Sequence, residues 1–143
     1  MNKIFSTHIP ALNLDIALLL LRVTIAVMML THGIPKLEML STDPIAFLDF
    51  MGLGPEISLY LTIFAEVICS FLLLFGITTR LAVIPLIITM LVAIFVVHIN
   101  DPFAKMEMGI HYLLVYIVLL LLGGGKYSVD YVLSHRKDNN RTT

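Results

Sequence analysis

The chain has 143 residues, of which 59% are hydrophobic and 13% are charged, and its mean hydropathy is +0.97. This composition excludes an ordinary soluble domain and is typical of an integral membrane protein. The net charge of −1 shows no basic bias, so nucleic acid is not expected as a partner and the lipid bilayer is.

Four apolar segments predict four membrane-spanning helices joined by short connectors. The first segment contains Arg22, and we expect it to end where Gly33 and Pro35 interrupt the apolar run. Short connectors favour antiparallel neighbours, so the predicted fold is an all-α, up-down-up-down bundle forming one domain over residues 1–143. The expected helices are about 14–33, 57–77, 80–98 and 106–123.

The connectors and the C-terminal tail carry weaker signals. The stretch 44–51 reads PIAFLDFM and predicts a short helix lying on the membrane surface. Three glycines, 123–125, stop the fourth span. The polar tail that follows, 126–143, is predicted to be mobile.

The positions of Lys and Arg predict the orientation in the membrane, because cytoplasmic loops carry an excess of both. Placing both termini in the cytoplasm puts six of these residues there and two in the outer loops. The six are Lys3, Arg80, Lys126, Arg136, Lys137 and Arg141, and the two are Lys36 and Lys105. We therefore predict a multi-pass membrane protein with both termini in the cytoplasm.

Glu66 is the only charged residue of the second apolar segment, 57–78. An ionised carboxylate in hydrocarbon is costly unless it is paired or protonated. Counting ~1.5 Å per residue from the expected helix ends puts Arg22 and Glu66 at about the same depth on neighbouring helices. The sequence therefore predicts a buried ion pair between Arg22 and Glu66. This pair either locks the bundle in register or lines a polar ligand or proton site.

A second group of polar residues collects at the outer ends of the helices. Histidine, lysine and tyrosine can hold a quinone head group, whereas Glu107 and His111, four residues apart, have a spacing that suits a divalent ion. Because polar residues collect at any membrane interface, no metal site is predicted. Ser58 and Thr62 are expected to relay hydrogen bonds from this group to Glu66. The predicted pocket comprises Ser58, Thr62, His32, Lys36, His98, Glu107, His111 and Tyr112.

Several short motifs follow one another along the chain. They are Arg22, His32-Gly33-x-x-Lys36-Leu37, Glu66, Gly76-x-x-Thr79-Arg80, His98, Glu107 and Gly125-Lys126-Tyr127-Ser128-x-Asp130. Their order and spacing resemble the DoxX family of small bacterial membrane proteins, although Gly124 stands where that family usually has proline. The resemblance implies a four-helix inner-membrane protein. It also implies redox biology, because relatives resemble the small subunit of thiosulfate:quinone oxidoreductase.

Three functions remain open at this point. The first is a membrane subunit of a redox system that binds a quinone and serves a partner protein. The second is a non-enzymatic adaptor or structural protein, and the third is a small transporter, which four helices without an internal repeat make the weakest. No complete catalytic motif is present, and the single cysteine, Cys69, cannot form an internal disulfide, so the sequence leaves open whether the protein is an enzyme.

Overall fold

A computed structural model describes residues 10–50 and 52–139, and within these residues all regular structure is helical. The elements are α1 (Ala11–Met39), α2 (Pro55–Ile63), η2 (Phe64–Cys69), α3 (Ser70–Phe75), α4 (Thr79–Val92), η3 (Ala93–Val97), α5 (Phe103–Leu122) and α6 (Val129–Asn139). The two η elements are π-helical turns that continue a neighbouring α-helix.

Within the described part of the chain, four helical stretches are long and apolar enough to cross a membrane. They are α1, the run Pro55–Phe75 formed by α2, η2 and α3, the run Thr79–Val97 formed by α4 and η3, and α5. The predicted all-α, four-helix membrane bundle is therefore confirmed.

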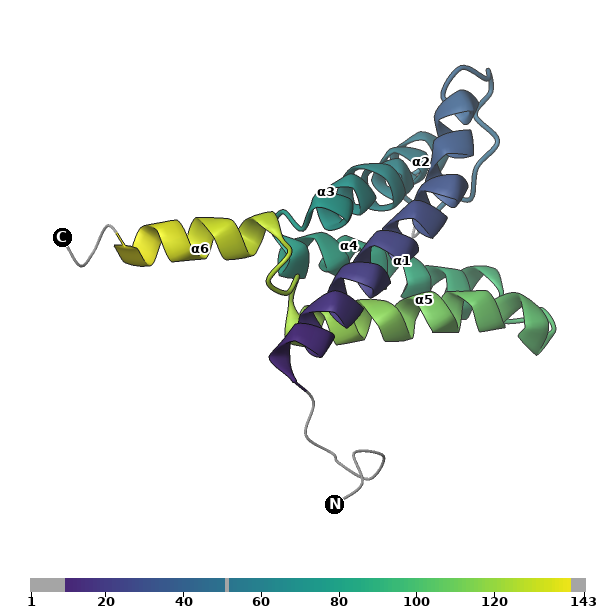
Figure 1. Cartoon of the computed structure of the whole chain (residues 1–143). Helices are drawn as coiled ribbons and strands as arrows, with labels where there is room; N and C mark the ends of the chain where they lie inside the picture. The colour runs from purple at the N-terminus through teal and green to yellow at the C-terminus, as the bar shows by residue number, and fades with distance from the viewer. Residues whose placement is uncertain (1–9, 51, 140–143) are drawn as a thin grey trace.

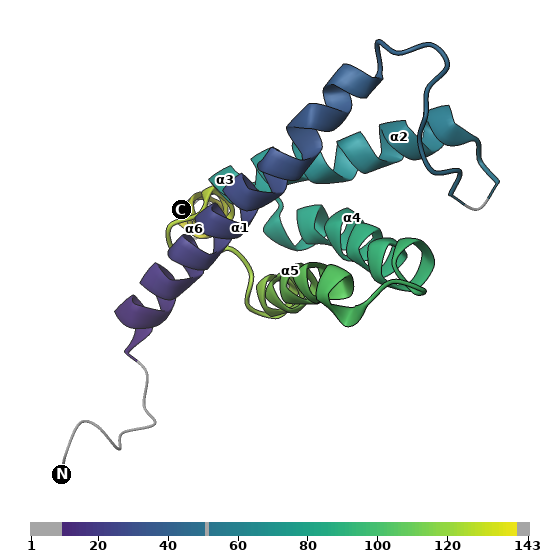
Figure 2. The same cartoon turned by 90° about the vertical axis from the view of Figure 1, so that its right-hand side faces the viewer.

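The four spans are arranged as two hairpins that meet at one end and diverge toward the other (Figures 1 and 2). In the first hairpin α1 packs along η2 and α3, and in the second α4 packs along α5. We call the closed end, with Phe75, Thr79 and Leu122, the terminal end. The open end, with Met39 and Phe103, is the pocket end.

Apolar residues from all four spans hold the hairpins together. The fully buried members of this core are Ala26, Leu73, Val83, Leu86, Tyr116 and Leu119. A smaller cluster toward the pocket end joins α1 to α2 and η2 and contains Leu30, Leu59, Ile63 and Val67. The two hairpins diverge toward the pocket end, and side chains from all four spans surround a cavity there.

The first helix does not end where the sequence predicts. Helix α1 continues through Gly33 and Pro35 to Met39, which adds about 9 Å at the helical rise. Pro35 cannot donate a backbone hydrogen bond, but the helix is held on both sides of it by packing: Gly33 is buried and Met39 packs on the smaller cluster. Tertiary contacts thus override the local signal for a helix end.

One further expectation outside the spans is wrong, and the tail contains a helix that was not predicted. Residues 44–50 are not helical, and two of their side chains, Ile45 and Phe47, pack against the smaller apolar cluster. The last residue of the predicted surface helix, Met51, lies outside the described residues. The tail begins with the helix α6, whose first turn is capped by Ser128, since the Ser128 hydroxyl accepts a bond of 3.2 Å from the Tyr131 amide. Residues 140–143 lie outside the described part of the chain.

Candidate functional site

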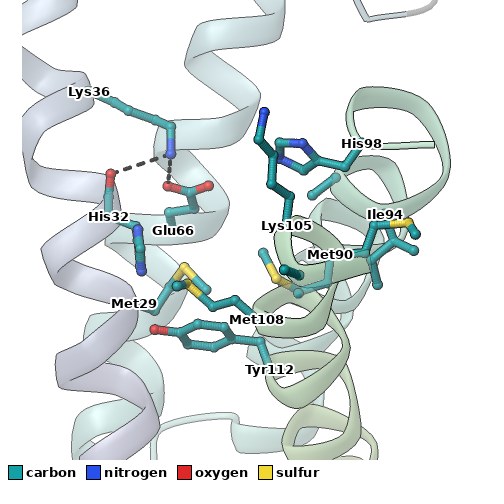
Figure 3. A pocket seen from close by; sticks show the side chains of 14 residues that line it. Met29, His32, Lys36, Glu66, Met90, Ile94, His98, Lys105, Met108 and Tyr112 are labelled. Carbon is teal, nitrogen blue, oxygen red and sulfur yellow. Dashed lines mark hydrogen bonds and ion pairs between the residues drawn. The ribbon is translucent and has the colours of Figure 1, made fainter. Parts of the chain in front are cut away.

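A cavity of about 480 Å³ lies between the two hairpins at the pocket end (Figure 3). Residues from all four spans line it, so its shape depends on how the two hairpins meet. Its ionisable and hydroxyl-bearing side chains are His32, Lys36, Glu66, His98, Lys105 and Tyr112. Its flexible apolar side chains include Met29, Met90, Met106 and Met108.

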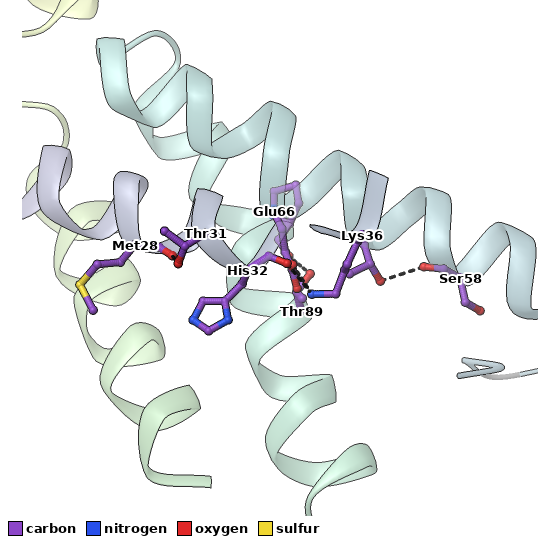
Figure 4. A network of polar contacts seen from close by, with 9 residues as sticks. Met28, Thr31, His32, Lys36, Ser58, Glu66 and Thr89 are labelled. Carbon is purple, nitrogen blue, oxygen red and sulfur yellow. Dashed lines mark hydrogen bonds and ion pairs between the residues drawn. The ribbon is translucent and has the colours of Figure 1, made fainter. Parts of the chain in front are cut away.

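An ion pair between Lys36 and Glu66 forms one wall of this pocket. The Lys36 ammonium donates to the Glu66 carboxylate and also, over 3.3 Å, to the carbonyl of His32 one turn earlier on α1 (Figure 4). The Glu66 side chain is 7% exposed and that of Lys36 is 24% exposed. Glu66 sits in the π-helical turn η2, a distortion that is common at functional sites.

Aromatic packing lines the floor of the pocket. The ring of His32 contacts the ring of Tyr112 edge to face, with centroids 5.8 Å apart. Tyr112 is buried, and its hydroxyl has no hydrogen-bond partner among the described residues. A buried donor of this kind is costly unless something binds it, so the Tyr112 hydroxyl is a candidate ligand contact.

The opposite wall carries a small charged network at the turn between η3 and α5. His98 Nδ1 lies 2.8 Å from Asp101 Oδ2, and Lys105 Nζ donates to Asp101 Oδ1 over 3.3 Å. The hydrogen bond from His98 and the charge of Lys105 hold the pKa of Asp101 below its ordinary value. The Asp101 carboxylate thereby holds the side chains of His98 and Lys105, which both line the pocket.

The predicted ion pair between Arg22 and Glu66 is wrong. Arg22 lies at the terminal end, where it donates to the carbonyls of Gly124 (2.9 Å) and Tyr127 (2.7 Å). Glu66 lies level with Gly33, eleven residues further along α1, which is about 16 Å at the helical rise. The depth argument failed because it placed the end of the first helix near Gly33 instead of Met39.

The polar relay predicted for Ser58 and Thr62 is also wrong. The Ser58 hydroxyl donates to the Gly54 carbonyl and accepts from the Phe50 amide, and the Thr62 hydroxyl donates to the Ser58 carbonyl. Both side chains therefore satisfy the backbone at the start of the second span, and neither lines the pocket.

Glu107 and His111 line a different hollow, which we call the lateral groove. This groove has a volume of about 550 Å³ and lies between α1 and α5. Its apolar lining comes from Leu21, Ile25, Met28 and Val115. The groove shares Ala104, Met108 and Tyr112 with the pocket, so the two hollows are neighbours.

Of the predicted pocket residues, the structure thus brings together His32, Lys36, His98 and Tyr112, and Glu66, predicted as the partner of Arg22, lines the same pocket. Sequence reasoning missed Lys105 and the methionines as pocket residues. Lys105 follows Asp101 by four residues, and this spacing is a signal that could have identified it. Among residues 10–50 and 52–139, no group of three or more His, Cys, Asp or Glu side chains is placed to hold a metal ion.

Comparisons with known proteins identify the family of the chain. The chain is 30% identical over 130 residues to "Putative oxidoreductase CatD" of Bacillus subtilis (strain 168), an alignment that covers 90% of this chain and 96% of the relative. No solved structure matches the chain. The DoxX family model matches residues 17–99. The chain therefore belongs to the DoxX family.

Proposed function

We propose that this protein is the membrane subunit of a redox system, that it binds a quinone in the pocket between its hairpins, and that it works with a partner protein. The observation that carries the proposal is the convergence of Lys36, Glu66, His32 and Tyr112 on one cavity within the membrane-spanning bundle. The name of the Bacillus relative, an oxidoreductase, supports a redox role.

The donors of the pocket fit a quinone, whose two carbonyl oxygens accept hydrogen bonds. A lysine ammonium has three N–H donors, and Lys36 uses two of them on Glu66 and His32. The third N–H is therefore free to bind one carbonyl oxygen. The unpartnered hydroxyl of Tyr112, which has almost no exposed surface, can bind the other once the side chains that cover it move. Methionine side chains around them supply soft contacts that adapt to a flat ring.

A bound quinone supplies two-electron redox chemistry, with two protons taken up on reduction. Within the described residues the chain carries no cysteine pair that could exchange electrons, because Cys69 is its single cysteine. We propose that the electrons come from the partner protein. The roles of this chain's own residues are to hold the ring, to keep a cationic donor at Lys36 and to balance its charge with Glu66.

The proposal is tested by two matched tyrosine variants. Both Tyr112 and Tyr116 have buried hydroxyls without a partner among the described residues, but only Tyr112 lines the pocket. Tyr112→Phe should weaken the binding of a short-tailed benzoquinone to protein in nanodiscs by roughly twofold to tenfold, the effect of one hydrogen bond. Tyr116→Phe should leave it unchanged. Equal effects of the two changes, or no quinone binding by the wild type, would contradict the proposal.

The orientation and the location are part of the same proposal. We place both termini in the cytoplasm and the pocket end at the outer face of the bacterial inner membrane, with the whole chain as one domain. The excess of Lys and Arg in the predicted cytoplasmic segments supports this orientation, although Lys3 and Arg141 lie outside the described residues. A reporter fused after Thr143 that is active only outside the cytoplasm would contradict it.

A further inference from the structure

The lateral groove between α1 and α5 opens on the side of the bundle rather than at its end. Thr24 and Met28 of α1 and Met108 of α5 line it and are exposed, although all three belong to membrane-spanning helices. Helices α1 and α5 pack against each other far less extensively than α4 and α5 do, which leaves the groove unfilled. An exposed surface on a spanning helix faces lipid, so this groove faces the bilayer.

The lining of the groove changes along its length. Its ionisable residues, Glu107 and His111, lie toward the pocket end of α5. Deeper positions are apolar except for Thr24 and Tyr112. From Met28 to Leu21 the groove follows α1 for about 10 Å at the helical rise. The groove therefore suits an apolar chain that runs into the membrane from a polar head.

The pocket and the groove are separated by few side chains. Ala104, Met108 and Tyr112 line both, and they form the wall between them. Ala104 is small, and Met108 is 55% exposed, so its unbranched side chain can swing aside without disturbing the core. The pocket thus adjoins the lateral groove, and Met108 is the residue between them that can move aside.

We propose that the ligand of the pocket reaches it from the bilayer through the lateral groove and leaves an apolar tail in that groove. The ligand class is then a membrane-dissolved amphiphile with a redox head, that is, a long-tailed quinone. This inference rests on the proposed function for the identity of the head. The tail gains no hydrophobic free energy when it moves from lipid into the groove. The groove therefore holds the tail by van der Waals packing and by having room for it.

The test blocks the groove and leaves the pocket open. In Thr24→Trp an indole ring fills the middle of the groove, whereas in Leu20→Trp the ring points into lipid, because Leu20 is 62% exposed and lines neither hollow. The probes are a benzoquinone with a decyl tail and the same head with a methyl group in its place. Binding is measured on protein in nanodiscs, with empty nanodiscs subtracted.

We expect Thr24→Trp to weaken the binding of the decyl probe at least tenfold and to leave the affinity for the methyl probe within twofold of the wild-type value. Leu20→Trp should leave both unchanged. If Thr24→Trp binds the decyl probe as the wild type does, or loses both probes equally, the groove is not the tail site, while the proposed function stands. If wild-type protein binds neither probe, the proposed function and this inference both fall.

Discussion

Gly33 of α1 lies directly against Glu66 of η2. A Cβ atom at position 33 would stand 2.9 Å from the Glu66 Cβ and 3.0 Å from the Glu66 carbonyl carbon. Only a residue without a side chain allows the two helices to approach this closely. The approach brings Lys36, one turn further along α1, within reach of the Glu66 carboxylate.

Replacing Gly33 by alanine should therefore destabilise the protein. Alanine favours helix formation over glycine by roughly 1 kcal/mol, but overpacking against the η2 backbone should cost more, about 1–3 kcal/mol. The matched control is Gly109→Ala, because a Cβ there would meet only the Ile94 side chain, at 3.1 Å. Thermal unfolding in mild detergent should show a lower unfolding midpoint than the wild type for Gly33→Ala and not for Gly109→Ala. Equal midpoints for the two variants would contradict the close approach.

Removing Lys36 and removing Glu66 should destabilise the protein by different amounts. Lys36→Met leaves the carboxylate of Glu66, which is 7% exposed, without its cation, whereas Glu66→Gln leaves a lysine that is 24% exposed and can reach water. We expect Lys36→Met to be the more destabilising change. The double variant should recover part of the loss, with a coupling free energy of about 1–3 kcal/mol in a double-mutant cycle. Additive losses would show that the two side chains do not interact.

Arg22 should act as an anchor for the segment that leads into α6. Its guanidinium spans two carbonyls, those of Gly124 and Tyr127, and a lysine cannot reproduce this two-pronged geometry. Arg22→Lys should therefore lower the free energy of unfolding by about 1.5–3 kcal/mol, the range for a hydrogen bond to a charged group.

The control for this change is Arg80→Lys, since Arg80 is exposed and donates to the Leu121 carbonyl over 3.1 Å. An exposed change of this kind is usually within about 0.5 kcal/mol. Limited proteolysis should also cut the segment near Tyr127 faster in Arg22→Lys than in the wild type. Unaltered cleavage and stability would mean that the segment is held without Arg22.

The sequence was most informative where the physical constraint was strongest. Long apolar runs predict spanning helices because unpaired backbone groups are too costly in hydrocarbon, and all four spans are present. The same argument correctly predicted that Glu66 needs a partner. It could not name that partner, because the depth of Glu66 relative to α1 depends on a close approach at Gly33 that no local pattern records.

Local signals failed where packing or capping decided the structure. Gly33 and Pro35 indicate a helix end, yet α1 continues to Met39, held by the buried Gly33 on one side of Pro35 and by the partly buried Met39 on the other. The polar tail predicts no helix, yet Asp130 accepts bonds from the amides of Thr78 and Thr79 at the start of α4, and so ties the first turn of α6 to the bundle. The lateral groove could not be predicted, because it results from how far α1 and α5 diverge.

The turn beside the pocket should lose stability in acid. The pKa of Asp101 is lowered in the folded protein, chiefly by the hydrogen bond from His98. A lowered folded-state pKa contributes stability that is fully present above the unfolded value, about 3.9, and is lost as the pH falls through the folded value. The difference in stability between the wild type and Asp101→Asn should therefore shrink below about pH 4.

Thermal unfolding of the wild type and of Asp101→Asn from neutral pH to about pH 3 measures this dependence, which falls in the range set by the unfolded pKa. Asp43→Asn, at an exposed position of the 40–54 connector, controls for the general effect of removing a carboxylate. A difference between wild type and Asp101→Asn that stays constant over the whole range would show that His98 and Lys105 do not stabilise the ionised form.

The central claim is that a quinone head binds between the hairpins, beside Lys36 and Tyr112. Photoaffinity labelling with an azido-substituted benzoquinone, followed by peptide mass spectrometry, measures this contact directly. We predict labels on α1 between Met29 and Lys36 and on α5 between Lys105 and Tyr112, all suppressed by an excess of unmodified quinone. Labels spread over the lipid-facing surface, or labels that excess quinone does not suppress, would contradict the claim.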